Sequence, residues 1–521
     1  MDTLQVCLHP TTESLAVVIT GESPTCINHS SLASNVQKLR RQLTLRGITR
    51  GTKVSIVLSN PYLMTVAFLA LTLQRSVVAP LNHGLQTPEF ECYYKDIGAE
   101  LVVLSTTEVD EQGSAYSAAK NSGLRVATCN IVDQEVAFDR FFDAPTPNIS
   151  ISASVPADDV LDGLNKPDPS DVALVLYTSG TTGKPKAVPL THGNIAHSIS
   201  TIVTHYALTA SDRAPVIMPL FHIHGLVAAL FAPLASGGSV IFAPRGGLTP
   251  SFHRDSIKYG ATWYTGTPTL HKLAVKMLST TKSEPAKYRF VRSCSSRLEG
   301  PLLRELEGLY GCPVVEAYAM TEAAHQVCSN PVDPAKTREG SVGESTGVDV
   351  RVLDERGSEV NTGETGEICI KGKSVMTGYL DNAAANAESF TCDGFFRTGD
   401  LGRTSEDGYV TLTGRIKEQI NKGGEKISPV EVDEVVNQHA DVAEAVTFAI
   451  SDDMYGENVA IAVVRNDGAS MTEADLKSWV GQRLLLSKVP KKVFFTTVIP
   501  KTAVGKLQRG LVASTILGER Y

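Results

Sequence analysis

Three short apolar runs alternate with helical segments near the start of the chain, and this alternation restricts the fold most. The runs cover residues 54–58, 77–81 and 101–104. Apolar residues recur at helical spacing over residues 30–45, and a second helix is predicted from Asn60-Pro61 through Leu73. Strands that alternate with helices form parallel sheets covered by helices. The sequence therefore predicts an α/β fold.

The chain of 521 residues is longer than one hydrophobic core usually supports, so we expect two or more domains. Residues 340–370 form short alternating runs separated by Gly and Asp, which predicts a small β-rich subdomain. The residues after Lys417 carry their own pattern, with a helix over 429–439 and strands near 443–450 and 459–465. A segment rich in Pro, Asp, Ser and Asn, residues 144–169, is predicted to be a connection.

Charge and hydropathy exclude some classes of function. The formal net charge of −8 argues against general electrostatic binding of nucleic acid or acidic membrane. The longest apolar stretches fall short of the ~18 residues that a membrane span needs. Nine scattered cysteines show neither zinc-like spacing nor a disulfide framework, which favours a reducing compartment. The first residues lack the pattern of a signal peptide, and the last residues, up to Tyr521, are not the Ser-Lys-Leu of a peroxisomal address. We therefore expect a cytosolic protein, with the peroxisome as the alternative, and by default a monomer.

The stretch 177–188 is a cluster of hydroxyl, glycine and lysine residues. It directly follows a predicted strand, residues 172–176. Such backbone and side-chain donors suit a polyphosphate. A Walker loop is excluded, because Pro185 biases Lys184 away from helical geometry. We predict a hairpin loop that binds nucleotide phosphates, and a plain polar surface loop is the alternative. The binding residues would be Thr178, Ser179, Gly180, Thr181, Thr182, Gly183, Lys184 and Lys186.

Three further strand ends open into polar loops. We predict strands that end at Met218, near Thr265 and at Ser293. Ligands of open α/β sheets bind outside the carboxyl ends of strands, so these loops are expected to line one cleft.

The phosphate loop and five later motifs resemble, in order, those of the adenylate-forming superfamily of acyl-CoA synthetases, luciferases and peptide-synthetase adenylation domains. The later motifs are Pro219-Leu220-Phe221-His222, Tyr318-Ala319-Met320-Thr321-Glu322, Arg397-Thr398-Gly399-Asp400, Gly414-Arg415-Ile416-Lys417 and Pro500-Lys501-Thr502-Ala503-Val504-Gly505-Lys506. The resemblance covers nearly the whole chain. It implies a large N-terminal AMP-binding domain over residues 1–415 and a small, mobile α+β domain over residues 416–521, with a hinge near Lys417.

The resemblance implies a two-step ligation that uses ATP, Mg²⁺ and coenzyme A. A carboxylate attacks the α-phosphate of ATP, and the thiol of coenzyme A then displaces AMP from the acyl-adenylate. Lys506 would bridge the carboxylate and the α-phosphate, Glu322 would bind Mg²⁺ and Thr321 would touch the α-phosphate. From the residues alone, Lys506 would be placed in a solvated loop and Thr321-Glu322 at a helix start.

Further roles follow from the same resemblance. Tyr318 would stack on adenine, with Glu316 and Ala317 beside it, and Asp400 and Arg415 would bind the ribose or phosphate. The pair Gly423 and Gly424 would lie near the pantetheine arm. A simple two-residue glycine turn is the alternative for that pair.

Within the superfamily, the segments around His222, Ser295 and Tyr318 resemble oxalate–CoA ligases. His222 would flank the acyl carboxylate, although a core histidine is the alternative, with His224 its structural partner. His325, with Ser295 or Ser296, would bind the second carboxylate of a small diacid; those serines could instead present backbone to adenine. Arg297 departs from the group's pattern and leaves another acid open.

Several other substrates and functions share some of these sequence features. Malonate or a medium-chain acid is the alternative substrate. An amino-acid adenylation enzyme usually carries an aspartate near the position of His222, and this chain has histidines there. A luciferase-like oxygenase shares every motif. A non-catalytic scaffold would be expected to have lost Lys506 or Glu322, and both are present.

Overall fold

The computed structural model describes residues 2–132, 134–142, 166–178, 185–282, 284–502 and 507–518. The chain separates into two compact units. Unit 1 comprises Met1–Glu339, Ser345–Val348 and Gly372–Ser389, and unit 2 comprises Gly340–Glu344, Asp349–Lys371 and Phe390–Tyr521. Most of the predicted connection, residues 144–165, lies outside the described residues. The predicted boundary between residues 415 and 416 stays a prediction.

Unit 1 contains a seven-stranded sheet of order β7-β6-β5-β3-β4-β8-β9. The inner strands β6, β5, β3, β4 and β8 run parallel, and the edge strands β7 and β9 run antiparallel to their neighbours. The strands are β3 (Lys53–Val57), β4 (Val77–Pro80), β5 (Leu101–Ser105), β6 (Arg125–Val132), β7 (Glu135–Phe142), β8 (Val172–Thr178) and β9 (Lys186–Thr191). The predicted parallel, helix-covered sheet is confirmed.

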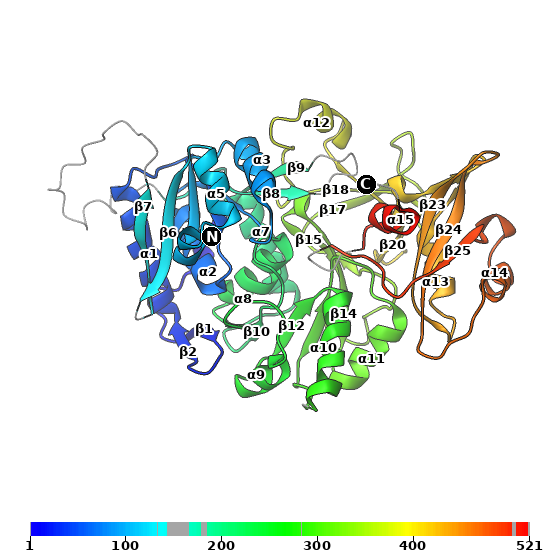
Figure 1. Ribbon diagram of the computed structural model, residues 1–521, viewed down its shortest axis with the longest axis horizontal. Helices are drawn as coiled ribbons and strands as arrows, with labels where there is room; N and C mark the ends of the chain where they lie inside the picture. The colour runs from blue at the N-terminus through cyan, green and yellow to red at the C-terminus, as the bar shows by residue number, and fades with distance from the viewer. Residues whose placement is uncertain are drawn as a thin grey trace. The chain divides into compact units, whose positions relative to one another are not determined.

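Helices pack on this sheet because this contact buries their apolar side chains away from water. Helix α1 (His29–Leu45) packs on β7 and on α2 (Pro61–Leu73), as Figure 1 shows. Every residue of α2 is buried, which is typical of a helix that is apolar on all sides. On α3 (Thr87–Ile97) and α5 (Ser114–Asn121), the apolar residues join one core with strand residues such as Val102. The predicted helices over residues 30–45 and up to Leu73 are confirmed.

Two smaller sheets are built mainly from residues of unit 1. The four-stranded sheet has the order β10-β11-β1-β2, with β1 (Leu15–Ile19), β2 (Thr25–Asn28), β10 (Arg213–Pro215) and β11 (Ser239–Phe242). The other has the order β12-β13-β14-β15-β16, with β12 (Trp263–Gly266), β13 (Phe290–Ser293), β14 (Val314–Met320), β15 (His325–Ser329) and β16 (Glu344–Ser345). Strands β12, β13 and β14 run parallel, so their carboxyl ends meet at one edge.

One predicted strand is wrong. Strand β10 ends at Pro215, and the apolar run 216–218 follows it as a buried segment outside any strand. Only the amide of Val216 continues the ladder, by donating to the carbonyl of Ile241 (2.9 Å). An apolar run marks burial, and burial alone does not require a paired strand.

The remaining helices of unit 1 are mostly short and lie around these sheets. They are η1 (Leu4–Cys7), α4 (Thr106–Asp110), α7 (His192–His205), the π-helix η2 (His224–Phe231), α8 (Ala232–Ala235), α9 (Phe252–Lys258), α10 (Pro268–Thr281), α11 (Gly300–Tyr310), η3 (Thr321–Ala323) and α12 (Ala383–Ser389). Within the described ranges, none of the helices has the length and hydropathy that crossing a membrane requires.

Unit 2 consists of an antiparallel sheet followed by an α+β segment. The first sheet has the order β17-β18-β19-β20, with β17 (Asp349–Leu353), β18 (Gly366–Lys371), β19 (Phe396–Thr404) and β20 (Val410–Arg415). The second has the order β22-β21-β24-β23 with β25 beside β24, and contains β21 (Ile420–Lys422), β22 (Glu425–Ile427), β23 (Val442–Asp452), β24 (Gly456–Arg465) and β25 (Lys492–Phe495). The predicted β-rich pattern near 340–370 is confirmed.

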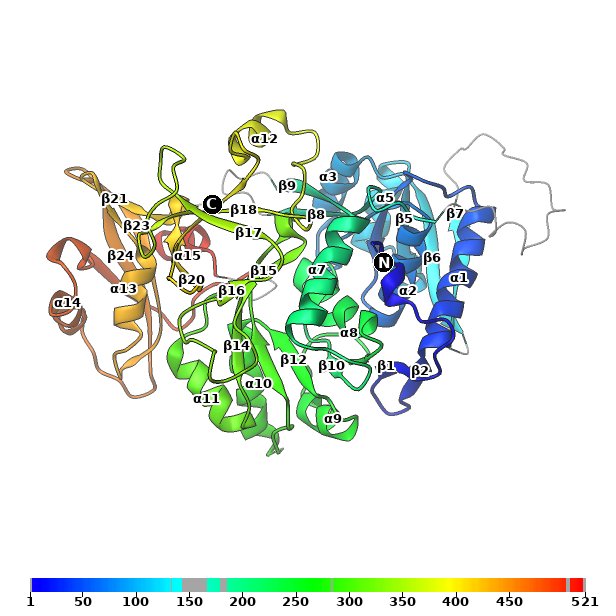
Figure 2. The same ribbon diagram turned by 180° about the vertical axis from the view of Figure 1, so that it is seen from behind.

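Helices cover both faces of the second sheet (Figure 2). Apolar residues of α13 (Pro429–Val436) and α14 (Glu473–Gly481) join one core with the strands. Those of α15 (Arg509–Leu517) join a second core through Val512. Short 3₁₀ turns, η4 (Ile416–Glu418) and η5 (Leu486–Lys488), complete the unit. The predicted helix over 429–439 is confirmed but ends three residues earlier, at Val436.

Candidate functional site

The predicted phosphate loop is carried by an antiparallel hairpin. Strands β8 and β9 pair in register as far as Thr178 and Lys186, which face each other across the hairpin. Residues 179–184, and with them Ser179, Gly180, Thr181, Thr182, Gly183 and Lys184, lie outside the described residues. The ammonium group of Lys186 lies 4.4 Å from the ring centroid of Tyr379. The hairpin therefore holds one cation of the predicted loop against an aromatic face.

The same tyrosine contacts the predicted metal ligand. The Tyr379 hydroxyl donates to Glu322 Oε1 at 3.0 Å, and Glu322 is buried in η3, directly after β14. Burial, and then the neighbouring carboxylate, raises the pKa of Tyr379, so the phenol keeps the proton that it donates. Thr321, next to Glu322, is half-buried. Lys186, Tyr379 and Glu322 thus form a connected polar cluster at the end of β14.

Glu322 fits the Mg²⁺ that the predicted reaction needs. A carboxylate is a hard oxygen donor, and Mg²⁺ is usually held by one or two carboxylates together with phosphates and water. In the part of the chain that the structure describes, no group of three or more His, Cys, Asp or Glu could hold a metal. The phosphates of a nucleotide and water are oxygen donors of the kind that would complete the coordination of a Mg²⁺ held by Glu322.

The predicted adenine segment runs along β14. Glu316, Ala317 and Tyr318 are buried there, and the Tyr318 hydroxyl lies 4.0 Å from the sulfur of Met320. Ser293 on β13 pairs with Glu316, so Ser295 and Ser296 follow the strand next to this segment. Both serines are half-buried, and Ser295 has a φ of 72°, which is uncommon outside glycine.

Sequence reasoning missed Arg292, which is fully buried at the end of β13. Its guanidinium donates from Nε to Tyr206 Oη (2.8 Å), from Nη2 to Gln326 Oε1 (3.0 Å) and from Nη1 to Thr265 Oγ1 (3.2 Å). Among the described residues, no carboxylate forms an ion pair with it. An arginine inside the apolar run of β13 was the available signal, since buried charges are rare without a partner.

His224 lies between this guanidinium and Ser295. Its Nε2 is 2.7 Å from Thr265 Oγ1 and 3.4 Å from Arg292 Nη1, and its Nδ1 is 3.0 Å from Ser295 Oγ. Burial first, and then the charge of Arg292, holds the pKa of His224 well below its usual range. His224 is therefore a neutral imidazole that links three elements of unit 1.

His325 stacks on His224, with ring centroids 4.9 Å apart and planes inclined by 27°. The side chain is buried, and neither ring nitrogen has a hydrogen-bond partner among the residues that the structure describes. Burial and the nearby Arg292 hold its pKa well below the usual range, so the ring is neutral. Its φ of 106° is also strained for a residue with a side chain. A buried N–H without an acceptor is costly, which favours a ligand at this position.

His222 belongs to the same group. It is half-buried, and its Nδ1 accepts from the backbone N–H of His224 at 3.3 Å. Gly225 is required beside it, because a Cβ there would lie 2.1 Å from the carbonyl oxygen of Pro219. The structure thus brings His222, Ser295 and His325 together around His224.

In unit 2, Asp400 on β19 and Arg415 on β20 are register partners and form an ion pair (Oδ1–Nε 2.7 Å). Gly423 and Gly424 have φ values of 61° and 94° and connect the paired residues Lys422 and Glu425. The predicted glycine turn is therefore present, which by itself accounts for both glycines.

Of the last two predicted site residues, Lys417 and Lys506, the structure describes only Lys417. Lys417 is exposed in η4. Lys506 lies outside the described residues, which end at Thr502 and resume at Leu507.

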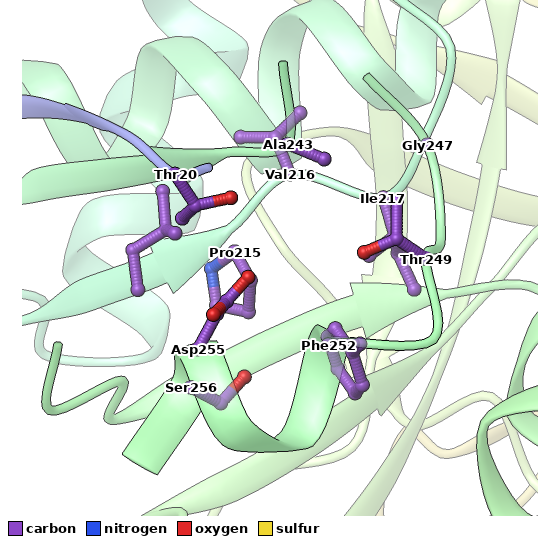
Figure 3. Close-up of a pocket in the computed structure, with 11 residues that line it drawn as sticks. Thr20, Pro215, Val216, Ile217, Ala243, Gly247, Thr249, Phe252, Asp255 and Ser256 are labelled. Atoms are coloured by element: carbon purple, nitrogen blue, oxygen red, sulfur yellow. The ribbon is translucent and has the colours of Figure 1, made fainter. Parts of the chain in front are cut away.

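A separate small pocket of unit 1 contains none of the predicted site residues (Figure 3). It is lined among others by Thr20, Thr249, Phe252, Asp255 and Ser256. Asp255 accepts a hydrogen bond from Ser251 (2.6 Å) and lies 3.5 Å from Arg254 Nε, so its charge is already partnered.

The β8–β9 hairpin, the buried Glu322 and the aromatic segment of β14 carry three of the motifs that resemble those of adenylate-forming enzymes. The sequence signature described as AMP-binding enzyme matches residues 9–380, and that of the AMP-binding enzyme C-terminal domain matches residues 431–506. The chain belongs to the AMP-binding enzyme family.

Individual relatives extend over almost the whole chain. A probable CoA ligase, CCL9, from Humulus lupulus is 40% identical over 97% of this chain and 94% of its own length. An oxalate–CoA ligase from Arabidopsis thaliana is 39% identical over 94% of both chains. The crystal structure of ATP-bound MatB from Rhodopseudomonas palustris superposes with a TM-score of 0.84 at 28% identity, covering 98% of this chain and 99% of the other.

Proposed function

We propose that this protein is an ATP-dependent acid–CoA ligase that converts a carboxylate, ATP and coenzyme A to acyl-CoA, AMP and diphosphate, and that its acid is oxalate or one similarly short. The observation that carries the choice of acid is the pair of buried, neutral imidazoles beside Arg292, a guanidinium that pairs with no carboxylate of the described residues. A short diacid would supply the missing negative charge. The similarity to an oxalate–CoA ligase supports the same choice.

The first step joins two anions, so the residues of the site must offset negative charge. Mg²⁺ bound at Glu322 would act as a Lewis acid on the phosphates. Lys186 and the loop that begins at Thr178 would hold the phosphates, and Thr321 would contact the α-phosphate. Lys506 would bring the carboxylate to the α-phosphate. His222 would flank the carboxylate, while Tyr379 orients Glu322 through its hydrogen bond.

The remaining roles concern the nucleotide and the thiol. Tyr318 would stack on adenine, with Glu316 and Ala317 beside it. Asp400 would accept from the ribose and Arg415 would bind the ribose or phosphate. Gly423 and Gly424 would let the pantetheine arm approach the backbone closely. The C-terminal residues from 416 would turn about Lys417 between the two half-reactions. We further propose that the protein is located in the cytosol and is a monomer.

The substrate is tested by ATP–diphosphate exchange with oxalate, malonate, acetate, a medium-chain fatty acid and several amino acids, followed by acyl-CoA formation. We expect exchange with oxalate to be fastest. Faster exchange with malonate or a longer acid would overturn the proposed substrate and keep the reaction. Exchange with an amino acid alone would make the protein an adenylation enzyme of another kind.

The role of Lys506 is tested separately for each half-reaction. Lys506→Ala is expected to abolish adenylation and to leave thioester formation from supplied acyl-adenylate largely intact, because the lysine acts only on the charges of the first step. Lys501→Ala, which removes a lysine of the same motif that pairs with Glu444, is the matched control. Equal loss of both half-reactions in Lys506→Ala would contradict this role.

A further inference from the structure

The hydrogen bonds around Arg292 fix which atoms carry protons. A guanidinium has only donors, so the contact of Nη1 with His224 Nε2 at 3.4 Å places a donor in front of that nitrogen. The same Nη1 also donates to Thr265 Oγ1. Among the described residues, the proton of this hydroxyl then has one acceptor, His224 Nε2, at 2.7 Å. His224 Nε2 is therefore an acceptor.

The proton of a neutral His224 must then be on Nδ1. From there it is donated to Ser295 Oγ at 3.0 Å. A hydroxyl that accepts in this way still has its own proton to donate. No other hydrogen bond of the Ser295 hydroxyl is present in the part of the chain that the structure describes, and Ser295 is only half-buried. The chain of donors thus starts at a buried cation and ends at a hydroxyl that can reach a ligand.

We propose that Arg292 and Thr265 are positioning residues that hold His224 in its Nδ1–H tautomer, so that Ser295 donates its hydroxyl proton to a carboxylate oxygen of the acid substrate. This inference rests on the proposed function for the identity of the acid. It assigns Ser295 to the acid rather than to adenine, and it gives His224 a defined role.

His325 supports the same direction independently. Its ring stacks on His224, is buried and has no hydrogen-bond partner at either nitrogen within the described part of the chain. A neutral imidazole always carries one N–H. Within the described residues, a second donor without an acceptor therefore lies beside the relay, by which we mean the hydrogen-bonded series Arg292, Thr265, His224 and Ser295. The φ values of Ser295 and His325, 72° and 106°, show that both ends of this donor pair are held in strained backbone. Strain of this kind gathers at ligand sites.

The tautomer is measured by NMR on the full chain with ¹⁵N-labelled histidine, and His224→Gln assigns the signal by its absence. We expect a protonated, pyrrole-type Nδ1 and an unprotonated, pyridine-type Nε2. The opposite tautomer, or an imidazolium, would overturn the relay even in an enzyme that is fully active on oxalate.

The consequence for the acid is measured by ATP–diphosphate exchange with oxalate and with oxamate, its uncharged-end analogue. Thr265→Val and Ser295→Ala should each lower kcat/KM for oxalate by about ten- to a hundredfold, and for oxamate by much less, since a hydrogen bond to a charged group is lost. Thr265→Ser, which keeps the hydroxyl, should restore the preference. An equal loss on both acids in Ser295→Ala would overturn the assignment.

The two proposals fail in different ways. If the intact enzyme prefers malonate, the substrate proposal fails. The relay is then tested by the NMR result and by comparing kcat/KM for malonate with kcat/KM for its monoamide. If the enzyme prefers an acid without a second polar end, the inferred donation loses its ligand and is overturned, while the ligase reaction stands.

Discussion

Two arginines, the buried Arg292 in unit 1 and the half-buried Arg509 in unit 2, differ in how their charge is balanced. Arg509 in unit 2 pairs with Glu418 (Nε–Oε2 3.1 Å) and with Asp433 (Nη1–Oδ2 2.6 Å). Among the residues that the structure describes, Arg292 in unit 1 donates to neutral oxygens alone, those of Tyr206, Thr265 and Gln326. The protein itself neutralises Arg509, whereas Arg292 leaves net positive charge in the interior.

The difference separates a structural cation from one that acts on a ligand. Arg509 joins the start of α15 to η4 and α13, so its charge is used in holding unit 2 together. A buried charge without a counterion costs stability, and such costs persist where a site is prepared for an ion of the opposite sign. Arg292 lies beside two neutral histidines and a half-buried serine, which is where a small anion would supply that charge.

The largest expected effect is on stability. Arg509→Met strands two carboxylates and should lower the free energy of unfolding of unit 2 by about 3–5 kcal/mol. Arg292→Met strands only neutral acceptors and should cost unit 1 about 1–2 kcal/mol. The two tryptophans, Trp263 in β12 and Trp479 in α14, report on one unit each.

Urea unfolding followed by fluorescence in Trp263→Phe and Trp479→Phe backgrounds therefore assigns each loss to its unit. Exposed Arg403→Met is the control and should change the free energy of unfolding by less than about 0.5 kcal/mol. Equal costs for Arg292→Met and Arg509→Met would remove the distinction between the two arginines.

The next effect is on substrate preference. Arg292→Met should lower kcat/KM for oxalate about ten- to a hundredfold more than for acetate, because an anion-directed set of donors is lost. Arg292→Lys keeps the charge and should retain part of the preference. Arg509→Met, assayed where it is folded, should leave the oxalate-to-acetate ratio unchanged, and a change in that ratio would show that the two arginines are not independent.

The smallest effect concerns pH and the histidines next to Arg292. Burial lowers the pKa of His325 and His224 in the folded state below the usual 6.5, so the unfolded chain binds more protons as the pH falls. Stability is then fully present above pH 6.5 and declines below it, by at most about 1.4 kcal/mol per pH unit for each histidine.

Urea unfolding of unit 1 at pH 7.5 and pH 5.5 measures this decline. His325→Asn should remove its share, and His439→Asn in unit 2 should leave the decline in unit 1 as it was. A decline that persists in His325→Asn at full size would show that His325 is not held neutral by burial.

Motifs with a fixed order located much of the candidate site in advance. The hairpin that ends at Thr178 and Lys186, the buried Glu322 after β14 and the paired Asp400 and Arg415 all lie in the local settings that their sequence neighbours suggest. Local patterns succeed here because strand, turn and short helix are decided within a few residues. The misplaced strand at 216–218 shows the limit, since apolarity reports burial rather than pairing.

The sequence by itself determined the class of fold, the order of the elements and the family, because periodicity and motifs are local properties of the chain. Only the tertiary structure decided that His224 lies between Arg292 and Ser295. It also decided that, within the described ranges, no carboxylate pairs with Arg292 and no hydrogen-bond partner reaches the ring of His325. The contacts of Arg292 with Thr265, of Arg292 with His224 and of His224 with Ser295 join residues that are 27 to 71 positions apart in the sequence. Which of them share a proton depends on distances of a few ångströms, and these are set by the parallel packing of β12, β13 and β14.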